Sequence, residues 1–203
     1  KFKKFNSQII KINTKRFENF FKVRENIYFF TETNKENLSF VIEISKKLKL
    51  KKNLLIEAIK NFNGLKYRQQ IIFRKKYLTI INDSKSTTFS SSMGVLKANN
   101  NIYWLLGGIY KKGDKFNLPK EYFSNIKAFI YGKNKNFFNK KLKGKIEYKN
   151  FDSLKNALKD ILKLIKKEKT IYKTILFSPC AASFDSFKNF EDRGFYFNKL
   201  IKK

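Results

Sequence analysis

The amino-acid sequence predicts an α/β protein in which a Rossmann-like, mostly parallel sheet carries helices on both faces and begins with an antiparallel hairpin. From about residue 67 onward, short apolar runs alternate with stretches whose apolar residues recur at helical spacing. Such alternation is typical of a parallel sheet whose helical connections cover both faces. Several apolar runs end in small or polar residues, and open α/β sheets bind ligands beyond the carboxyl ends of their strands. We therefore expect a functional site at that edge.

The first part of the chain carries weaker signals. Apolar runs over residues 8–12 and 26–30 are predicted as edge strands or loops. After them, an apolar stripe from Leu38 to Leu48 predicts an amphipathic helix that Asn37 opens.

A second helical stripe covers residues 54–62. Asn53 is its predicted N-cap and Gly64 its predicted end, because these residue types favour those positions. We place a domain boundary just after this helix, which divides the chain into residues 1–65 and 66–203.

The second predicted domain contains the sheet. Its first two strands are expected to form a hairpin with a tight basic turn, and the later strands are separated by helices. An Asn- and Lys-rich stretch before residue 145 predicts a short helix, and a closing helix is expected to run to about Ile201. The other predicted elements are strands over 70–73, 77–81, 102–106, 128–131, 145–148 and 174–177, and helices over 90–98 and 153–166.

Composition limits the classes of function. The chain has 203 residues and a formal net charge of +30, which raises the question of a polyanionic partner. The lysines are spread over nearly every segment, which favours solvated faces of an ordinary fold over a dedicated polyanion-binding surface. The alternative is a basic, aromatic-rich module that binds single-stranded nucleic acid by stacking and charge.

The cysteine and histidine content narrows the chemistry further. Cys180 is the single cysteine and there is no histidine, so an internal disulfide is excluded and a zinc site is not expected. A reducing cytoplasm fits this composition. No apolar run approaches the roughly 18 residues that a membrane span needs.

The first polar strand end spans residues 82–87, directly after an apolar run. An aspartate at position 83 suits a ribose hydroxyl or a magnesium-linked water, and Lys85 suits an anion. The alternative is a helix N-cap cluster, since Asp, Ser and Thr favour helix starts.

Two further strand ends carry similar signals. Gly107 and Gly108 allow a backbone to approach a ligand closely, with Lys111 reaching the same crevice, although a plain tight turn gives the same pattern. Residues 178–194 pass from small residues into helical spacing, as at a ligand-binding strand–helix joint or an ordinary one. Arg68, before the first strand of the sheet, is either a phosphate clamp or a surface ion pair.

Taken in order, these stretches resemble a known family. They are Asn-Asp-Ser-Lys-Ser-Thr from Asn82, Leu-Leu-Gly-Gly from Leu105, and Ser-Pro-x-x-Ala-Ser-Phe-Asp-x-Phe-x-Asn-Phe-x-x-Arg-Gly from Ser178. The sequence resembles the C-terminal domain of the Mur ligases that add D-glutamate during peptidoglycan synthesis, over roughly Asn34 to the C-terminus. Each motif alone is weak evidence, whereas three in the same order are specific.

The resemblance implies a fold and an activity. Residues 1–65 are expected to be the end of the ATP-binding central domain and residues 66–203 the C-terminal, D-glutamate-binding domain. The implied enzyme is a cytoplasmic ADP-forming ligase that joins D-glutamate to UDP-N-acetylmuramoyl-L-alanine through an acyl phosphate, with ATP and Mg²⁺. It is expected to be monomeric at full length and to bind no specific nucleic acid.

The resemblance also implies roles for particular residues. Lys85 is the expected catalytic residue. The expected contacts to ATP come from Asn37, Arg68 and Asp83. The expected contacts to D-glutamate come from Lys85, Thr87, Lys111, Ser183, Phe184 and Phe190.

Some positions depart from the family pattern. The glycine–lysine loop is one residue longer, so Lys112 is an alternative to Lys111. The other departures are Tyr67 where the family has histidine, Gln70 for glutamate, Thr88 for asparagine, and Cys180–Ala181 in the reverse order.

The sequence contains no Gly-x-x-x-x-Gly-Lys-Ser/Thr phosphate-binding loop. The magnesium ligands are therefore expected in a part of the central domain that these residues do not contain, and no metal ligand is assigned here. We expect the chain to be a piece of a longer protein that does not turn over ATP by itself.

Overall fold

The protein is described here by a computed structural model covering residues 11–12, 26–167 and 171–202. The chain divides into two compact units, residues 1–62 and 63–203. The predicted run over 8–12 lies largely outside the described residues.

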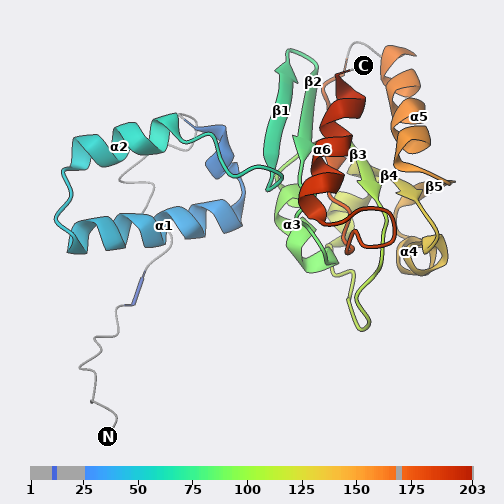
Figure 1. Cartoon of the computed structure of the whole chain (residues 1–203), viewed down its shortest axis with the longest axis horizontal. Helices are drawn as coiled ribbons and strands as arrows, with labels where there is room; N and C mark the ends of the chain where they lie inside the picture. The colour runs from blue at the N-terminus through green and yellow to red at the C-terminus, as the bar shows by residue number, and fades with distance from the viewer. Residues whose placement is uncertain (1–10, 13–25, 168–170, 203) are drawn as a thin grey trace, which may run out of the picture. The chain divides into compact units, whose positions relative to one another are not determined.

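The first unit is helical. It contains the 3₁₀ helix η3 (Ile27–Phe30) and the helices α1 (Glu32–Lys47) and α2 (Lys52–Asn61), drawn as an antiparallel pair joined by a turn in Figure 1. The Asn26 amide group donates to the Ile59 carbonyl at 2.7 Å and to the Phe62 carbonyl at 2.8 Å. The small buried core consists of Phe29, Leu38, Ile42 and Ile59.

Three expectations for this unit were wrong in detail. Residues 26–30 form a 3₁₀ turn, not a strand or loop, because the Asn26 side chain accepts from the Tyr28 N–H at 3.0 Å. The first helix begins at Glu32 after a Thr31 cap, which places Asn37 well inside it. The second helix begins after Lys51 without a side-chain cap, so Asn53 is a helical residue.

The second unit contains the predicted sheet. Its strand order is β1-β2-β6-β3-β4-β5, with β1 and β2 antiparallel and the remaining neighbours parallel, which confirms the fold class (Figure 1). The strands are β1 (Gln70–Lys75), β2 (Leu78–Asn82), β3 (Ile102–Leu106), β4 (Ile126–Tyr131), β5 (Glu147–Phe151) and β6 (Lys173–Phe177).

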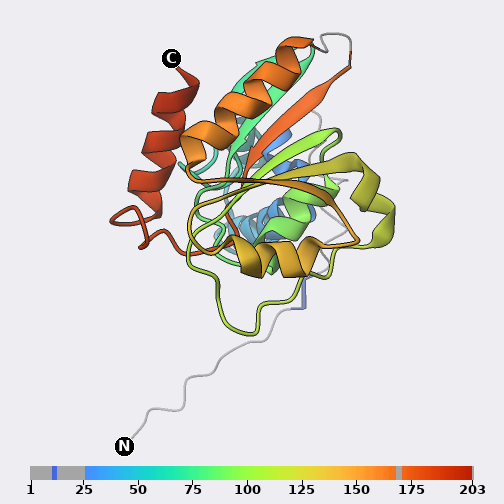
Figure 2. The same ribbon diagram turned by 90° about the vertical axis from the view of Figure 1, so that its right-hand side faces the viewer.

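Helices cover both faces of this sheet, as Figure 2 shows. The side chains of α3 (Phe89–Lys97) and α4 (Lys135–Leu142) pack around Trp104 on one face. On the other face α5 (Leu154–Lys167) and α6 (Phe190–Ile201) pack around Phe129 and Phe177. The 3₁₀ helix η4 (Lys120–Asn125) precedes β4.

Strand β5 begins two residues later than predicted. The chain leaves α4 through a turn in which the N–H groups of Lys145 and Ile146 both donate to the Leu142 carbonyl. Gly144 in this turn has a φ of 71°, a conformation that favours glycine. The turn after the helix therefore includes Lys145 and Ile146, which the apolar pattern had assigned to the strand.

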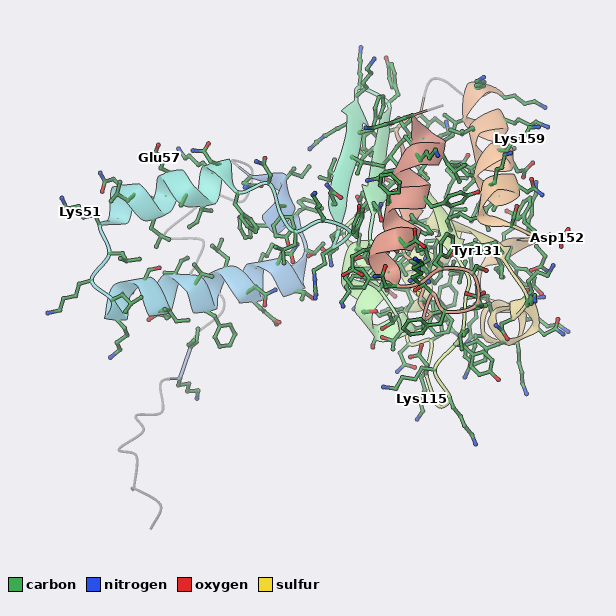
Figure 3. The ribbon with its side chains drawn as sticks, viewed as in Figure 1. Lys51, Glu57, Lys115, Tyr131, Asp152 and Lys159 are labelled. Carbon is green, nitrogen blue, oxygen red and sulfur yellow. The ribbon has the colours of Figure 1, made fainter. Side chains whose placement is uncertain are left out.

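The aromatic side chains are largely core residues in this unit. Trp104, Phe89, Phe129, Phe138, Phe177 and Phe197 are each at most 1% exposed. Most lysines instead lie at the surface, as the labelled Lys115 and Lys159 show in Figure 3, although Lys173 is buried. This distribution does not support the nucleic-acid alternative, which needs exposed stacking rings beside the charges.

We expect Ile161→Ala to lower the free energy of unfolding by about 2–5 kcal/mol, because it removes a fully buried side chain beneath the sheet. The matched control on the same helix is Lys159→Ala, which should change stability by no more than about 0.5 kcal/mol. Urea denaturation followed by circular dichroism measures both, and equal effects would contradict the packing of α5.

Candidate functional site

The loops that follow β2, β3 and β6 lie together at the carboxyl edge of the sheet. Backbone pairing continues beyond the strands: Asp83 N–H donates to the Phe177 carbonyl at 2.7 Å, and Gly107 N–H to the Pro179 carbonyl at 3.1 Å. Ile109 and Ala182 form an antiparallel bridge. The three motifs found in the sequence are therefore neighbours in space.

The paired glycines are explained by neighbouring protein backbone. A Cβ on Gly107 would lie 2.2 Å from the Tyr131 carbonyl oxygen, and one on Gly108 would lie 2.4 Å from the Ala182 carbonyl oxygen. Both glycines also have φ values, 152° and 128°, that other residues rarely adopt. The turn thus holds the loop that carries Lys111 close to the loop after β6.

Asp83 is a buried group that joins two loops. It is 5% exposed, and its carboxylate accepts the Ser178 hydroxyl at 2.8 Å and the Gln69 N–H at 3.1 Å. Burial raises the pKa of Asp83 to about 7, against the opposing effects of these hydrogen bonds and of the charges on Arg68 and Arg193. A carboxylate in this setting is available to titrate near neutral pH.

A chain of hydroxyl groups extends from Asp83 to the start of α3. Ser178 and Ser92 share a hydrogen bond of 2.6 Å, and Ser92 and Ser86 share another of 2.6 Å. The Ser92 hydroxyl also lies 2.9 Å from the sulfur of Cys180, whose thiol pKa is raised by burial. Asp83 and Ser86 of the first motif therefore have hydrogen-bond partners in Ser178 and Ser92, as buried polar groups require.

Lys85 lies between the end of β2 and the start of α6. Its N–H donates to the Tyr67 carbonyl at 3.0 Å, and its ammonium nitrogen lies 3.8 Å from the centre of the Phe190 ring. Both side chains are half-buried. The structure thus brings together two residues that the sequence had assigned to the same ligand.

Arg193 was not assigned a role from the sequence. It is 1% exposed and donates to the Ser84 carbonyl at 2.7 Å, the Ser84 hydroxyl at 3.1 Å and the Ala181 carbonyl at 2.9 Å. Its guanidinium group joins α6 to the loops after β2 and β6. The available signal was its position four residues before the apolar Phe197, which places both side chains on the same, inward face of the helix.

Arg68 projects from a constrained loop. Its neighbours Tyr67 and Gln69 have positive φ values of 62° and 47°, and Arg68 itself is exposed. The Tyr67 ring lies against Gly194, where a Cβ would approach a ring carbon to 2.4 Å. Tyr67, the departure from the family histidine, is therefore packed against the last motif.

The other predicted contact residues differ in accessibility. Phe184 is 71% exposed, whereas Ser183 is 3% exposed at the start of a turn in which its carbonyl accepts from Phe187 N–H at 2.9 Å. Asn37 is exposed on α1 in the other unit. Among the other predicted contact residues, Thr87, Lys111 and its alternative Lys112 are exposed.

The loop with Lys111 has a separate anchor. Asp114 accepts the N–H of Phe89, at the start of α3, at 2.7 Å. Its own N–H donates to the Lys111 carbonyl at 3.1 Å, which closes a turn that contains Gly113. Asp114 therefore ties the glycine–lysine loop to the α3 N-terminus.

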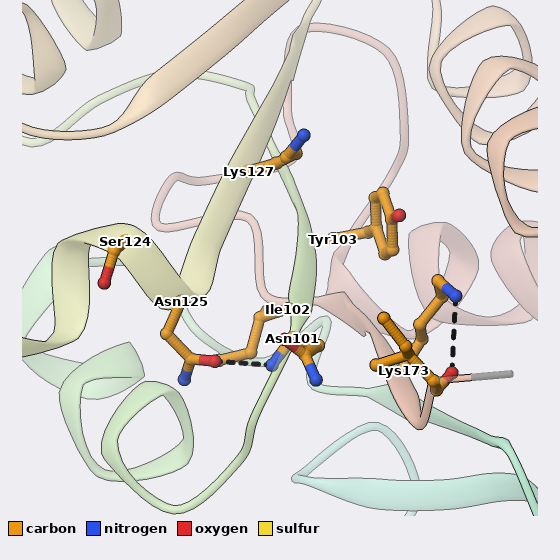
Figure 4. A pocket seen from close by; sticks show the side chains of 8 residues that line it. Asn101, Ile102, Tyr103, Ser124, Asn125, Lys127 and Lys173 are labelled. Atoms are coloured by element: carbon orange, nitrogen blue, oxygen red, sulfur yellow. Dashed lines mark hydrogen bonds between the residues drawn. The ribbon is translucent and has the colours of Figure 1, made fainter. Parts of the chain in front are cut away.

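A cavity of about 130 Å³ lies at the opposite edge of the sheet (Figure 4). It is lined by residues at the amino ends of β3, β4 and β6, including Ile102 and Lys173. No predicted contact residue lines this cavity, so it is separate from the candidate site.

Within residues 11–12, 26–167 and 171–202, no group of at least three His, Cys, Asp or Glu side chains is arranged to hold a metal ion. In the same part of the chain, no helix has the length and apolarity needed to cross a bilayer.

The fold is that of a Mur ligase domain. It is similar to the crystal structure of MurF from Acinetobacter baumannii, with a TM-score of 0.61 and 17% identity over 85% of this chain and 38% of that one. It is also similar to MurC, UDP-N-acetylmuramate-alanine ligase, from Thermotoga maritima, with a TM-score of 0.54, 16% identity and coverages of 85% and 39%. No family model matches the sequence.

In sequence, the chain is similar to UDP-N-acetylmuramoylalanine–D-glutamate ligases. It is 34% identical over 173 residues to that of Wolbachia sp. subsp. Brugia malayi and 38% identical over 168 residues to that of Rickettsia bellii. These matches cover 84% and 82% of this chain but only 34% and 37% of the relatives. The resemblance predicted from the motifs is confirmed, and the chain spans about a third of the length of these relatives.

We expect the free energy of unfolding of this chain to fall as the pH rises from about 4 to 7, because of Asp83. In that range the Asp83 carboxyl is protonated in the folded state, where its pKa is about 7. In the unfolded state, where its pKa is 3.8, it is ionised. This contribution, at most roughly 4 kcal/mol, is complete below about pH 4 and is lost as the pH rises through 7.

Asp83→Asn should remove this slope, and denaturant titrations at a series of pH values measure it. The control is Asp152→Asn, whose carboxylate is 93% exposed and paired with Lys135 at 2.9 Å. If Asp83→Asn left the pH dependence of stability unchanged, a group other than Asp83 would be responsible for it.

Proposed function

We propose that this chain provides the D-glutamate-binding side of an ATP-dependent ligase that adds D-glutamate to UDP-N-acetylmuramoyl-L-alanine in cytoplasmic peptidoglycan biosynthesis. The observation that carries the proposal is the position of Lys85, a half-buried residue whose ammonium group lies over the Phe190 ring at the carboxyl edge of the sheet. Among the described residues it has no carboxylate within 4.0 Å. The similarity to D-glutamate ligases supports the choice of ligand.

D-Glutamate suits this edge because it brings two carboxylates and one amine. Lys85, after β2, and Lys111, after β3, offer separate positive charges for the two carboxylates. Because both lysines pair with carboxylates and not with the amine, the amine is left free to react. Thr87, Ser183 and Phe184 complete the proposed contact set, with Lys112 as the alternative to Lys111.

The ATP side of the proposal rests on Asn37, Arg68 and Asp83. Arg68 is exposed and suits a phosphate, which guanidinium groups bind bidentately. Asp83 already accepts two hydrogen bonds, and a carboxylate has about four acceptor positions, so a ribose hydroxyl can be accommodated. Because Asp83 is 5% exposed, this contact requires movement of the loop that carries Gln69.

The chemistry that these side chains supply is mainly positioning. ATP, with Mg²⁺, supplies the phosphoryl group that activates the carboxylate of the UDP-linked substrate. Lys85 and Lys111 hold the incoming amine beside that activated carbonyl, and such alignment is worth about 7–11 kcal/mol of barrier in favourable cases. The same ammonium groups stabilise the negative charge that develops on the carbonyl oxygen during attack.

The first unit supports the proposal that residues 1–65 are part of a larger domain. Helix α1 has a buried apolar stripe, with Leu38 and Ile42, and a second apolar face at Phe40, Val41 and Ile44. The side chains of that second face are 48–57% exposed. A helix that is apolar on two faces is typical of a position between two layers.

We expect the 203-residue chain to bind D-glutamate more tightly than L-glutamate, and Lys85→Ala to weaken D-glutamate binding by about 10- to 100-fold through loss of a charge-assisted hydrogen bond. Isothermal titration calorimetry measures both affinities. Lys159→Ala, on the exposed side of α5, is the control for the removal of one positive charge. Equal affinities of the Lys85 and Lys159 variants would argue against the assignment.

A further inference from the structure

The contact between Lys85 and Phe190 is unlike the other lysine–ring contacts of the described residues. The Lys85 nitrogen lies 3.8 Å from the ring centre, whereas the contacts made by Lys75, Lys76, Lys141 and Lys145 range from 5.2 to 5.7 Å. An ammonium group over an aromatic face is attracted by the negative charge of the π system. Because the attraction grows as the distance falls, the short distance makes this contact the strongest of the set.

The ring is fixed by the start of α6. Phe190 is the first residue of the helix, and its carbonyl accepts the Ser84 hydroxyl at 2.8 Å. The preceding residue, Asn189, caps the helix by accepting the Asp192 N–H at 2.8 Å. Arg193, one turn further on, donates to the same Ser84. The Phe190 backbone is therefore tied directly to the residue that precedes Lys85.

The lysine is fixed from the other side. Its N–H is bonded to the Tyr67 carbonyl, and Tyr67 packs on Gly194 of the same helix. Only the side chain of Lys85 retains freedom, and a lysine side chain has a large rotamer entropy to lose on binding. The ring removes part of that freedom before any ligand arrives.

An aromatic ring and a carboxylate differ in how many N–H donors of the Lys85 ammonium group they leave free. A carboxylate would neutralise the ammonium group and occupy its N–H donors, whereas an aromatic face attracts the charge and leaves donors free on the opposite side. Preorganisation of a binding group in its bound conformation raises affinity because the ordering cost has already been met. A ring under Lys85 thus suits a group that must later bind an anionic ligand.

We propose that Phe190 is a positioning residue that holds the Lys85 ammonium group over its ring, ready for a ligand carboxylate. The proposal rests on the proposed function for the identity of that ligand, D-glutamate. In this proposal Phe190 affects affinity through Lys85, in place of the direct contact with D-glutamate that the family resemblance implies. The aromatic character of residue 190, not only its bulk, is what the role requires.

The first experiment detects the contact without a ligand. The 203-residue chain is labelled with ¹³C-lysine, and the Lys85 signal is identified by its absence from Lys85→Arg. Protons above an aromatic face are shielded by its ring current, so the Lys85 Hε signals should lie upfield of the other lysines. Phe190→Leu should return them to the common position, and Phe190→Tyr or Phe190→Trp should keep them shifted.

The second experiment measures D-glutamate affinity in the same variants by calorimetry. Phe190→Leu should weaken binding by about 2- to 30-fold, the range that cation–π interactions span, while Phe190→Tyr restores it to within about twofold. Phe195→Leu is the matched control, since Phe195 lies on the same helix, is 61% exposed and belongs to no assigned contact. Circular dichroism confirms that each variant folds.

The outcomes separate this proposal from the proposed function. Unshifted Lys85 signals in the wild type, or undiminished D-glutamate affinity in a folded Phe190→Leu variant, overturn the positioning role. Lost affinity with Lys85 signals that remain shifted also overturns it, because Phe190 would then act by another route. A wild-type chain that fails to bind D-glutamate contradicts the proposed function, and the Lys85 signals then decide the positioning role alone.

Discussion

The arrangement of the carboxyl edge depends on one buried charge. Arg193 lies inside α6, and its guanidinium group donates to Ser84 after β2 and to Ala181 after β6. A buried charge is costly unless it is hydrogen-bonded, and here the guanidinium group donates to two backbone carbonyls and one hydroxyl. Burial lowers the pKa of Arg193, while Asp185 and Asp83 favour its charged form. The helix is thereby held against both strand ends, and the two loops keep a fixed separation.

Several features of the candidate site follow from that clamp. With α6 fixed, Phe190 lies beneath the Lys85 ammonium group and Gly194 receives the Tyr67 ring. The Tyr67 contact helps to define the loop that presents Arg68 to solvent, and Asp83 holds the other side of that loop through Gln69. The proposed D-glutamate and ATP contacts of the second unit are therefore parts of one hydrogen-bonded assembly. A change in the loop that carries one set of proposed contacts is therefore expected to alter the position of the loop that carries the other.

The sequence was most informative where a single physical pattern dominated. Strand β3 was predicted with its observed bounds, because residues 102–106 are apolar throughout and both of its faces are covered by helices. It was least informative at helix ends, where side-chain capping decides the boundary. Thr31 and Lys51 precede the first two helices in place of the expected Asn37 and Asn53, and η3 forms because Asn26 caps it. The choice among neighbouring polar caps depends on tertiary contacts, such as those between Asn26 and the end of α2.

The order of apolar runs and the motifs at their ends were sufficient to predict the α/β class, the antiparallel first hairpin and the edge of the sheet at which the three motifs meet. These are local properties, because strand burial and strand–helix alternation are written in the spacing of neighbouring residues. The contacts that define the site are not local. The burial of Asp83, the clamp formed by Arg193 and the ring beneath Lys85 each join residues far apart in the chain. Only the folded chain brings these groups within hydrogen-bonding or van der Waals distance, so the tertiary structure decides which polar residues support one another and which remain open to a ligand.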